Sequence, residues 1–327
     1  MFTPITFPTA LFFWLTYDNN KSLQYLEKLP GELSKTVFHR NSLLASDQEY
    51  SLQAPLHIMV PKDSLRHHGP QFICHVMPQN LPEGSFVQLT GSTFIISPEL
   101  CFLLAANYLS IPELTVLACD LCGIYAHDER AEYKQISRRP VTTSTEIKNY
   151  LNKTRRIDGI TKARIAARYA IDNSNSPMES KLVAACVLRY LYGGYGFEKP
   201  ELNYNVQLSP AGIEVIGLDH LCCDIVWPSK RLIVEYDSDL AHFNKRRFYF
   251  DKKRTTALIL SDYSVITVTR DDFRNYNSME RLFSVISSSL NKRISRRDFE
   301  ASYKVRRELL KELFLTTNSL DWFQMFS

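Results

Sequence analysis

The chain has 327 residues, which is long for a single compact core, so we expect two domains. Hydrophobic residues make up 45% of the chain and aromatic residues 12%, a composition that excludes a disordered protein. The net charge of +4 is too small to identify a partner by itself, and only 11 glycines argue against an enzyme built on glycine-rich loops.

The cysteines and the apolar segments indicate a reduced, cytoplasmic protein. The seven cysteines are an odd number and form no disulfide framework of the secreted type. Cys119 and Cys122 form one CxxC motif, but a zinc ribbon needs two, so we expect both on a buried helix. Cys222 and Cys223 are expected to pack as small apolar groups. The start of the chain has no basic region, and the apolar segment around Pro98 is too short for a bilayer, so no membrane contact is expected.

Residues 1–130 are predicted to form an α+β domain. The first 50 residues look largely helical, and Gly91 marks a hairpin turn between two later strands. Ser97, Pro98 and Glu99 form a helix start, with a capping hydroxyl, a proline in the first turn and then an acid. The expected strands cover 56–60, 72–76, 86–89 and 93–96, and the expected helices cover 98–109 and 112–125.

His57 and His75 lie on separate predicted strands of this domain. Strand histidines that form hydrogen bonds with neighbours are commoner than strand histidines that bind a metal ion. Hydrogen bonding is therefore the expected role for both, and no catalytic group of residues is visible in this domain.

Residues 131–172 are polar and basic, and we interpret them as a helical linker. One helix is expected near 144–154 and a second over 160–173.

Residues 173–327 are predicted to form an α/β domain with the element order α–β–β–β–α–β–α. Ser176 and Pro177 begin its first helix, and the next segments alternate in the manner of strands. The expected helices cover 177–192, 240–261, 278–291 and 296–315, and the expected strands cover 203–208, 213–227, 231–237 and 263–269.

Acidic residues interrupt two neighbouring strands of this domain. If a hairpin closes over residues 228–231, Asp224 lies opposite Glu235 and their side chains point to the same face. The period of two adds Asp237 to that face. Three carboxylates so close would repel one another, and Mg²⁺ is typically held by one or two carboxylates and several waters. The alternative is that the strand ends in solvent and its acids are simply hydrated.

The segment 242–254 is strongly basic, with six Lys or Arg residues and one Asp. Arg247, Asp251 and Arg254 are spaced so that they can form ion pairs along one side of a helix. Basic helices are usually solvated, but an acidic cluster beside one suits the cleavage of a polyanion. The candidates for contact with a nucleic-acid backbone are Lys245, Arg246, Arg247 and Lys253.

The order of these residues resembles the very-short-patch-repair-like endonuclease domain of the PD-(D/E)XK nuclease superfamily. The segments that carry the resemblance are SPMESKL, DIVWPSKRLIVEYDSDLAH, DKKRTTALILSDY and VITVTRDDF, within roughly 176–290. The resemblance implies a restriction-endonuclease-like αβββαβ core. It also implies an endonuclease dependent on Mg²⁺ or Mn²⁺ that cleaves DNA, with RNA left open, in phage defence or repair.

The family's functional residues are carried over by position. Asp224 matches the first metal-binding aspartate, Glu235 matches the second acidic residue, and Glu179 matches a helix acid that joins the metal shell. His242 follows the strand where the family often places a histidine, as a general acid or base or a phosphate contact. Asp237 stands where many members have the catalytic lysine, a departure that leaves the activation of water open.

Two alternatives concern structure rather than catalysis. Glu179 in a first helical turn also complements the helix dipole, and His242 can be an ordinary residue at a helix start. The metal-site interpretation requires Asp224 and Glu235 on one side of the sheet, with neither sealed against a neighbouring arginine.

The N-terminal half resembles the sensor-like region of abortive-infection type IV antitoxins, in the segments LHIMVPKDS, FICHV and FIISPELCFLLA. This implies a toxin or another protein as a partner. It also supports a second hypothesis, a catalytically inactive nuclease-like regulator or antitoxin that binds DNA. A protein-interaction scaffold is the third possibility, and the oligomeric state stays open.

Overall fold

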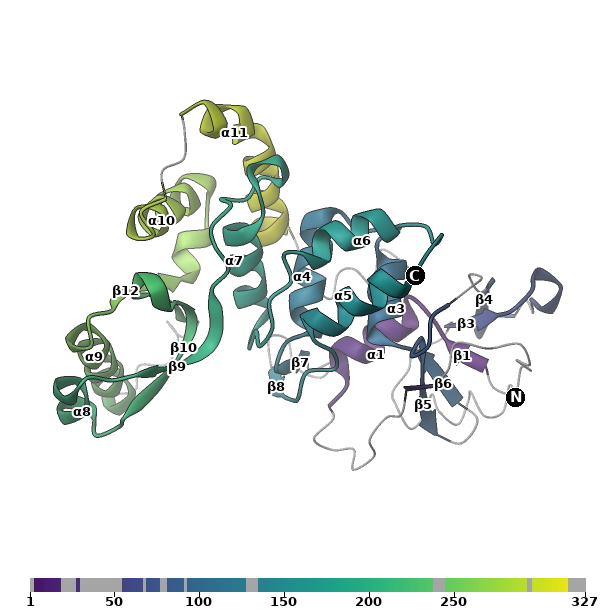
Figure 1. Ribbon diagram of the computed structural model, residues 1–327, viewed down its shortest axis with the longest axis horizontal. Coiled ribbons are helices and arrows are strands. Elements are labelled where there is room, and N and C mark those ends of the chain that lie inside the picture. The colour runs from purple at the N-terminus through teal and green to yellow at the C-terminus, as the bar shows by residue number, and fades with distance from the viewer. Residues whose placement is uncertain are drawn as a thin grey trace. The chain divides into compact units, whose positions relative to one another are not determined.

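The computed structural model shows an α+β protein, as predicted (Figure 1). It describes residues 3–18, 28–29, 55–66, 69–76, 81–90, 93–127, 135–237, 245–292 and 296–316. The contacts divide the chain into two compact units, Met1–Ala170 with Leu320–Ser327, and Ile171–Ser319. The boundaries near 130 and 172 come from the sequence alone and stay predictions.

The first unit contains a six-stranded sheet with the order β2-β5-β6-β1-β3-β4. The four strands expected from the sequence are present. Strand β1 was not predicted: it pairs in parallel with β6 and antiparallel to β3, so it joins the pair β5-β6 to the pair β3-β4. The strands are β1 (Thr3–Ile5), β2 (Lys28–Leu29), β3 (Leu56–Val60), β4 (Phe72–Val76), β5 (Phe86–Thr90) and β6 (Thr93–Ile96).

The helix start predicted at Ser97 is confirmed, and the next helix also begins at a capping serine. The Ser97 side chain accepts a hydrogen bond from the backbone N–H of Leu100, and Ser110 forms a capping box with Glu113. The first 50 residues were expected to be largely helical, and α1 is the helix in the part of them that the structure describes. Gly91, the expected hairpin turn, lies outside the described residues. The helices are α1 (Thr9–Thr16), α3 (Pro98–Ala105), α4 (Ile111–Leu121), α5 (Ser144–Lys153) and α6 (Ile160–Ala167).

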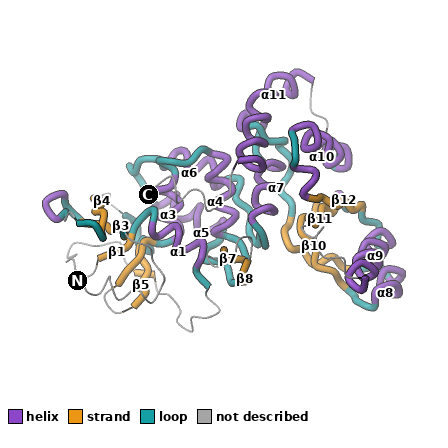
Figure 2. The backbone as a smooth tube through the Cα atoms, turned by 180° about the vertical axis from the view of Figure 1, so that it is seen from behind, coloured by secondary structure: helices purple, strands orange, loops and turns teal. Residues whose placement is uncertain are grey.

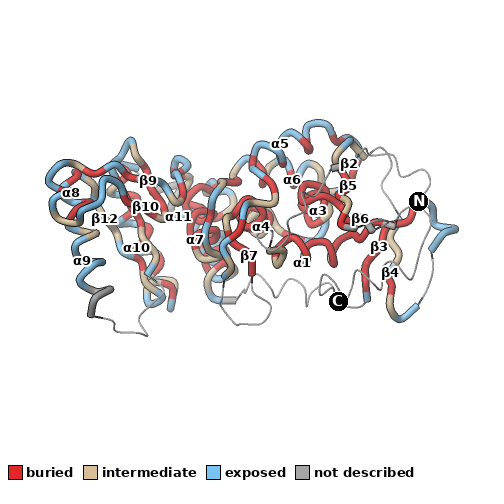
Figure 3. Tube along the Cα trace, turned by 90° about the horizontal axis from the view of Figure 1, so that it is seen from below, coloured by how far each residue is buried: buried red, intermediate tan, exposed pale blue. Residues whose placement is uncertain are grey.

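The segment predicted as a linker contributes α5 and α6 to the first unit, together with β8 (Gln135–Ser137), which pairs with β7 (Tyr125–His127). Helix α5 packs against α3, and α6 packs against α4. The reason is an apolar side on each helix: Ile147 and Leu151 of α5 and Ala163 of α6 are buried (Figure 3). Their burial makes these helices part of the core of this unit.

The cysteine expectations are confirmed with one exception. Cys119 and Cys122 are buried at α4, and Cys223 is buried in the sheet of the second unit. Cys222 is exposed, so its expected packing as a small apolar group is wrong. Neighbouring side chains of a strand point to opposite faces, and it is the side chain of Cys223 that is buried. Among the described helices, none is long and apolar enough to cross a membrane.

The second unit is built on a four-stranded sheet with the order β12-β11-β10-β9 (Figure 2). Strands β9, β10 and β11 form an antiparallel meander, and β12 returns parallel to β11 after the crossover helix α9. The elements are α7 (Pro177–Val187), β9 (Glu201–Gln207), α8 (Pro210–Ile216), β10 (His220–Trp227), β11 (Leu232–Asp237), α9 (Lys245–Leu260), β12 (Ser264–Thr269), α10 (Tyr276–Ser289) and α11 (Arg296–Lys311).

The element order agrees with the predicted α–β–β–β–α–β–α series, apart from one added helix. Residues 213–227 were expected to be a single strand, but 213–216 belong to α8 and the strand begins only at His220. The Ser209 side chain caps α8, Pro210 starts it, and Gly217 ends it with a left-handed φ of 76°. These local signals outweigh the β-like run of Ile213 and its neighbours.

Helix α9 covers part of this sheet. Ala257 and Leu258 pack in one buried cluster with Cys223, Val226 and Ile233. Helix α8 lies along α9 at this end of the unit (Figure 1). The packing holds β10 and β11 rigidly beside α9, and the candidate site lies on these elements.

Candidate functional site

The predicted hairpin between β10 and β11 is present with the expected closure. Trp227 pairs with Leu232, Val226 with Ile233 and Ile225 with Val234, around a short 3₁₀ turn at Pro228–Lys230. One further step of this register places Asp224 opposite Glu235. The Asp224 carboxylate reaches across the hairpin and accepts a hydrogen bond of 2.9 Å from the backbone N–H of Tyr236.

Glu179 approaches this pair from the first turn of α7. Its carboxylate accepts hydrogen bonds from the Asn175 backbone N–H (2.9 Å), the Ser176 hydroxyl (2.9 Å) and the Asn203 side-chain amide (3.0 Å). Ser176 in turn caps the helix at the backbone N–H of Glu179. The capping role expected for a first-turn acid is therefore present, and the same carboxylate also lies within electrostatic reach of Glu235.

Asp224 carries the clearest sign of excess negative charge. Burial and the nearby carboxylates of Glu235 and Glu179 raise the pKa of Asp224 to about 7. The hydrogen bond from Tyr236 and the positive charge of Arg254 oppose this shift without cancelling it. Burial and the Glu235 charge also raise the pKa of Glu179, although its three hydrogen bonds oppose the change.

Glu235 is paired with Arg254 of α9. The guanidinium Nη2 lies 2.8 Å from Glu235 Oε1, and the same group donates to the backbone oxygen of Cys222. Glu235 therefore has a neighbouring arginine, the arrangement that would argue against a metal site if the pair were sealed. The pair is not sealed, however, because 24% of the Arg254 side chain and 19% of the Glu235 side chain remain exposed.

The spacing of the basic segment suggested that Arg254 pairs with Asp251, but it pairs with Glu235 instead. It lies three and four residues before Ala257 and Leu258, so it sits on the side of α9 that faces the sheet. This spacing could have indicated the pairing of Arg254 with an acid of the sheet, since a cation on the buried side of a helix requires an acidic partner in the core. Asn203 of β9, which donates to Glu179, was also missed, and no sequence pattern marked it.

Two of the remaining predicted site residues, Asp237 and Lys253, have side chains that the structure describes. Asp237 lies two residues beyond Glu235, at the exposed end of β11, where its backbone pairs with Thr269 of β12. Lys253 is exposed on α9. His242 and the side chains of Lys245, Arg246 and Arg247 lie outside what the structure describes.

Two carboxylates of this site could hold a metal ion. Among the described residues, no group of three His, Cys, Asp or Glu side chains is arranged to hold a metal ion. Mg²⁺ does not need such a group, because it keeps several waters and is commonly held by one or two carboxylates. Asp224 and Glu235 supply two, and the raised pKa of Asp224 marks the charge that a cation would neutralise.

The two strand histidines of the first unit form a hydrogen bond, as expected. His57 Nδ1 lies 2.8 Å from His75 Nε2, with the rings stacked 5.1 Å apart. Burial lowers the pKa of His57 to about 4, with a further contribution from His75, and burial also lowers the pKa of His75. This pair is thus held neutral, with one ring donating to the other.

Comparison of the chain with protein-family models, with curated proteins and with solved structures gave no significant match.

Proposed function

We propose that the second unit is a metal-dependent endonuclease that hydrolyses phosphodiester bonds of DNA. The observation that supports this most is the convergence of the Asp224, Glu235 and Glu179 carboxylates on the β10–β11 hairpin, where Arg254 pairs with Glu235 and the pKa of Asp224 stays raised. A buried cluster that keeps an unbalanced acid is unfavourable in a purely structural sheet and favourable where a cation binds.

Asp224 and Glu235 would hold Mg²⁺ or Mn²⁺. Such an ion activates a water molecule and neutralises charge that develops at phosphorus. Glu179 is fixed by three hydrogen bonds and adds negative charge that strengthens the attraction for a cation. Arg254 orients Glu235, and its charge is placed to contact a phosphate oxygen.

The roles of the residues outside the cluster rest on the resemblance. Asp237 lies where a lysine would be expected, so we assign it to the water shell of the ion. His242 would exchange a proton with water or the leaving group. Lys245, Arg246, Arg247 and Lys253 would contact the DNA backbone.

The element order of the second unit also supports the proposal. An antiparallel meander, a crossover helix and a parallel fourth strand follow one another, and the acids lie on the two central strands. This order supports the αβββαβ core that the resemblance implies, with α8 as an additional helix. Fold alone does not prove an activity, so the acids carry the argument.

Plasmid DNA incubated with Mg²⁺ or Mn²⁺ tests the proposal. We expect the wild type to nick or cut the plasmid, and the isosteric variants Asp224→Asn and Glu235→Gln to lose activity by at least about a hundredfold. Asp262→Asn is the matched control, because Asp262 is exposed and asparagine tolerates its left-handed φ. Equal cutting by the wild type and Glu235→Gln, or no cutting by either, would show that the mechanism is wrong.

A catalytically inactive DNA-binding regulator or antitoxin is the second candidate. The ion pair between Glu235 and Arg254 favours it, because the guanidinium occupies one of the two oxygens that a metal ion would use. In that case DNA binding would be independent of metal and sensitive to salt, and Asp224→Asn would bind DNA like the wild type. A mobility shift in EDTA, combined with the cleavage assay, separates the two candidates.

The first unit would then act as a sensor, or as the part that binds a toxin or another protein. The support for this role is the sequence resemblance. A pull-down with the full-length protein as bait, with and without DNA, would test this role. Capture of the product of a neighbouring toxin gene would support it, and no capture would contradict it.

A further inference from the structure

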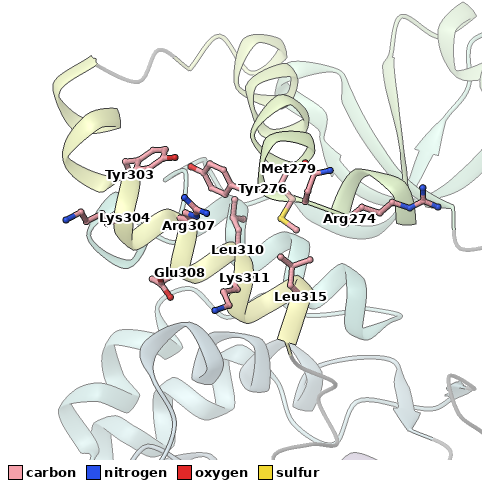
Figure 4. A pocket seen from close by; sticks show the side chains of 11 residues that line it. Arg274, Tyr276, Met279, Tyr303, Lys304, Arg307, Glu308, Leu310, Lys311 and Leu315 are labelled. Atoms are coloured by element: carbon pink, nitrogen blue, oxygen red, sulfur yellow. The ribbon is translucent and has the colours of Figure 1, made fainter.

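A groove on the second unit lies between the start of α10 and one side of α11 (Figure 4). Its volume is about 680 Å³, which is within the range of sites that bind nucleotide-sized ligands. Its inner part is apolar, since Met279 and Leu310 are fully buried there. None of its lining residues belongs to the carboxylate cluster.

Cations dominate the charged residues that line this groove. Arg274, Lys304, Arg307 and Lys311 carry positive charge, against the single acid Glu308. Lys304, Arg307 and Lys311 follow one another at intervals of three and four residues, so they form a stripe about 10 Å long on one side of α11. Lys304 and Arg307 form no ion pair with an acid in the described part of the chain, and both are exposed.

Two tyrosines stand beside these cations. Tyr276 and Tyr303 meet edge to face with ring centroids 5.6 Å apart, and the Arg307 guanidinium lies 5.7 Å from the centre of the Tyr276 ring. Figure 4 shows Tyr303, Tyr276 and Arg307 next to one another at the groove. Tyr303 keeps 41% of its surface exposed, whereas the Tyr276 hydroxyl is held by Glu280 at 2.7 Å.

We propose that this groove binds single-stranded nucleic acid, with the phosphates on the stripe of α11 and a base stacked on Tyr303. Cations alone would suit any polyanion, but a basic groove with an exposed aromatic ring is the combination that single strands use. In a duplex the bases are stacked on one another and are not available to Tyr303. An acidic peptide would pair with the cations but would leave the ring without a stacking partner.

This inference rests on the proposed function and deepens it, because it names the form of nucleic acid that the second unit binds. Binding at the groove requires no metal ion, so it is measured in EDTA. An absence of cleavage would therefore not contradict the groove proposal. An absence of binding at the groove would not contradict the cleavage proposal.

Fluorescence anisotropy of the full-length chain with labelled DNA and RNA strands of about 12 nucleotides tests the proposal. We expect Lys304→Ala with Arg307→Ala to weaken binding by at least about tenfold and to reduce the slope of log K against log salt by about 1.4. Tyr303→Leu is expected to weaken binding by about tenfold with an unchanged slope, and Tyr303→Phe to bind like the wild type. Comparison of the two strands shows whether DNA or RNA is preferred.

The control is Lys230→Ala with Lys292→Ala, which removes two exposed cations of the same unit outside the groove and is expected to leave binding unchanged. The proposal is overturned if the wild type binds neither strand, or if the groove variants bind as the control does. It is also overturned if polyglutamate or a duplex of equal length competes as well as the single strand.

Discussion

Two clusters of the second unit contain a glutamate paired with an arginine, and they differ in charge balance and exposure. Around Glu280, the carboxylate accepts hydrogen bonds from the hydroxyls of Tyr195 (3.1 Å) and Tyr276 (2.7 Å) and lies 3.7 Å from Arg306. The Arg306 side chain is fully buried and lies 5.1 Å from the centre of the Tyr195 ring. Among the contacts of the described residues, this cluster has one acid and one base, and it joins α10, α11 and the turn that contains Tyr195.

The cluster around Glu235 has the opposite character. Arg254 pairs with Glu235, the charges of Glu235 and Glu179 act on Asp224, the ion pair is partly exposed, and the pKa of Asp224 stays raised. The comparison shows that an arginine–glutamate pair does not by itself indicate a structural or a functional role. What distinguishes the two is whether negative charge is left over and whether solvent can reach the arginine, since the two glutamates are about equally exposed.

The largest effect on stability is expected at the balanced cluster. Glu280→Ala leaves Arg306 buried without its acid and removes the partner of two tyrosine hydroxyls, so we expect the free energy of unfolding to fall by about 3 kcal/mol. Arg281→Ala on the same helix is the control, because its side chain is exposed and contacts Ser278. Urea titration of both variants measures the difference, and equal losses would mean that the Glu280 cluster is not structural.

A pH-dependent effect is expected in the first unit. The pKa of His57 is lowered to about 4, below its value in the unfolded chain, so the neutral form is favoured by folding. The stabilisation is complete above about pH 6.5 and is lost as the pH falls toward about 4, by about 2 kcal/mol.

Urea titrations between about pH 7 and pH 4.5 measure this loss. His57→Leu should make it smaller, and His220→Gln, which changes an exposed histidine, should leave it as in the wild type. A loss of equal size in His57→Leu would contradict the assignment to the histidine pair.

A smaller effect of opposite sign is expected at the unbalanced cluster. The folded-state pKa of Asp224 is raised above the unfolded value, so ionised Asp224 destabilises the protein as the pH rises from about 4 through about 7. Asp224→Asn keeps an oxygen for the Tyr236 N–H and removes the charge. We expect the variant to be more stable than the wild type by about 1 kcal/mol at pH 8 and equal to it near pH 4.

Thermal unfolding at the two pH values checks this prediction. Glu280→Gln at the balanced cluster is the comparison, because removing that charge should destabilise the protein at both values. If Asp224→Asn proved less stable than the wild type at pH 8, the description of Asp224 as an unbalanced acid would be wrong.

Local signals in the sequence predicted most elements and the hairpin that carries the acids. The turn at Pro228 and the alternation on both sides of it were enough to place Asp224 beside Glu235, and Ser97, Ser176 and their prolines marked helix starts. Helix α8 was missed because its apolar residues read as a strand and Gly217 was not recognised as a helix end.

Long-range contacts account for what the sequence did not show. The parallel pairing of β1 with β6 joins segments about 90 residues apart, a separation at which no local pattern applies. Arg254 was assigned to Asp251 by local spacing, whereas the fold offered Glu235 of a strand as a more buried partner. The charge balance that distinguishes the Glu235 cluster from the Glu280 cluster could therefore be determined only from the structure.

The most direct test of the account is a titration of Mn²⁺ into the full-length protein, followed by the paramagnetic resonance signal of the free ion. The account predicts that the wild type binds Mn²⁺, that Mg²⁺ displaces it, and that Asp224→Asn and Glu235→Gln lose this binding while Asp262→Asn retains it. Wild-type protein that takes up no Mn²⁺, or that binds it as well after Asp224→Asn, would contradict the claim that these acids form a cation site.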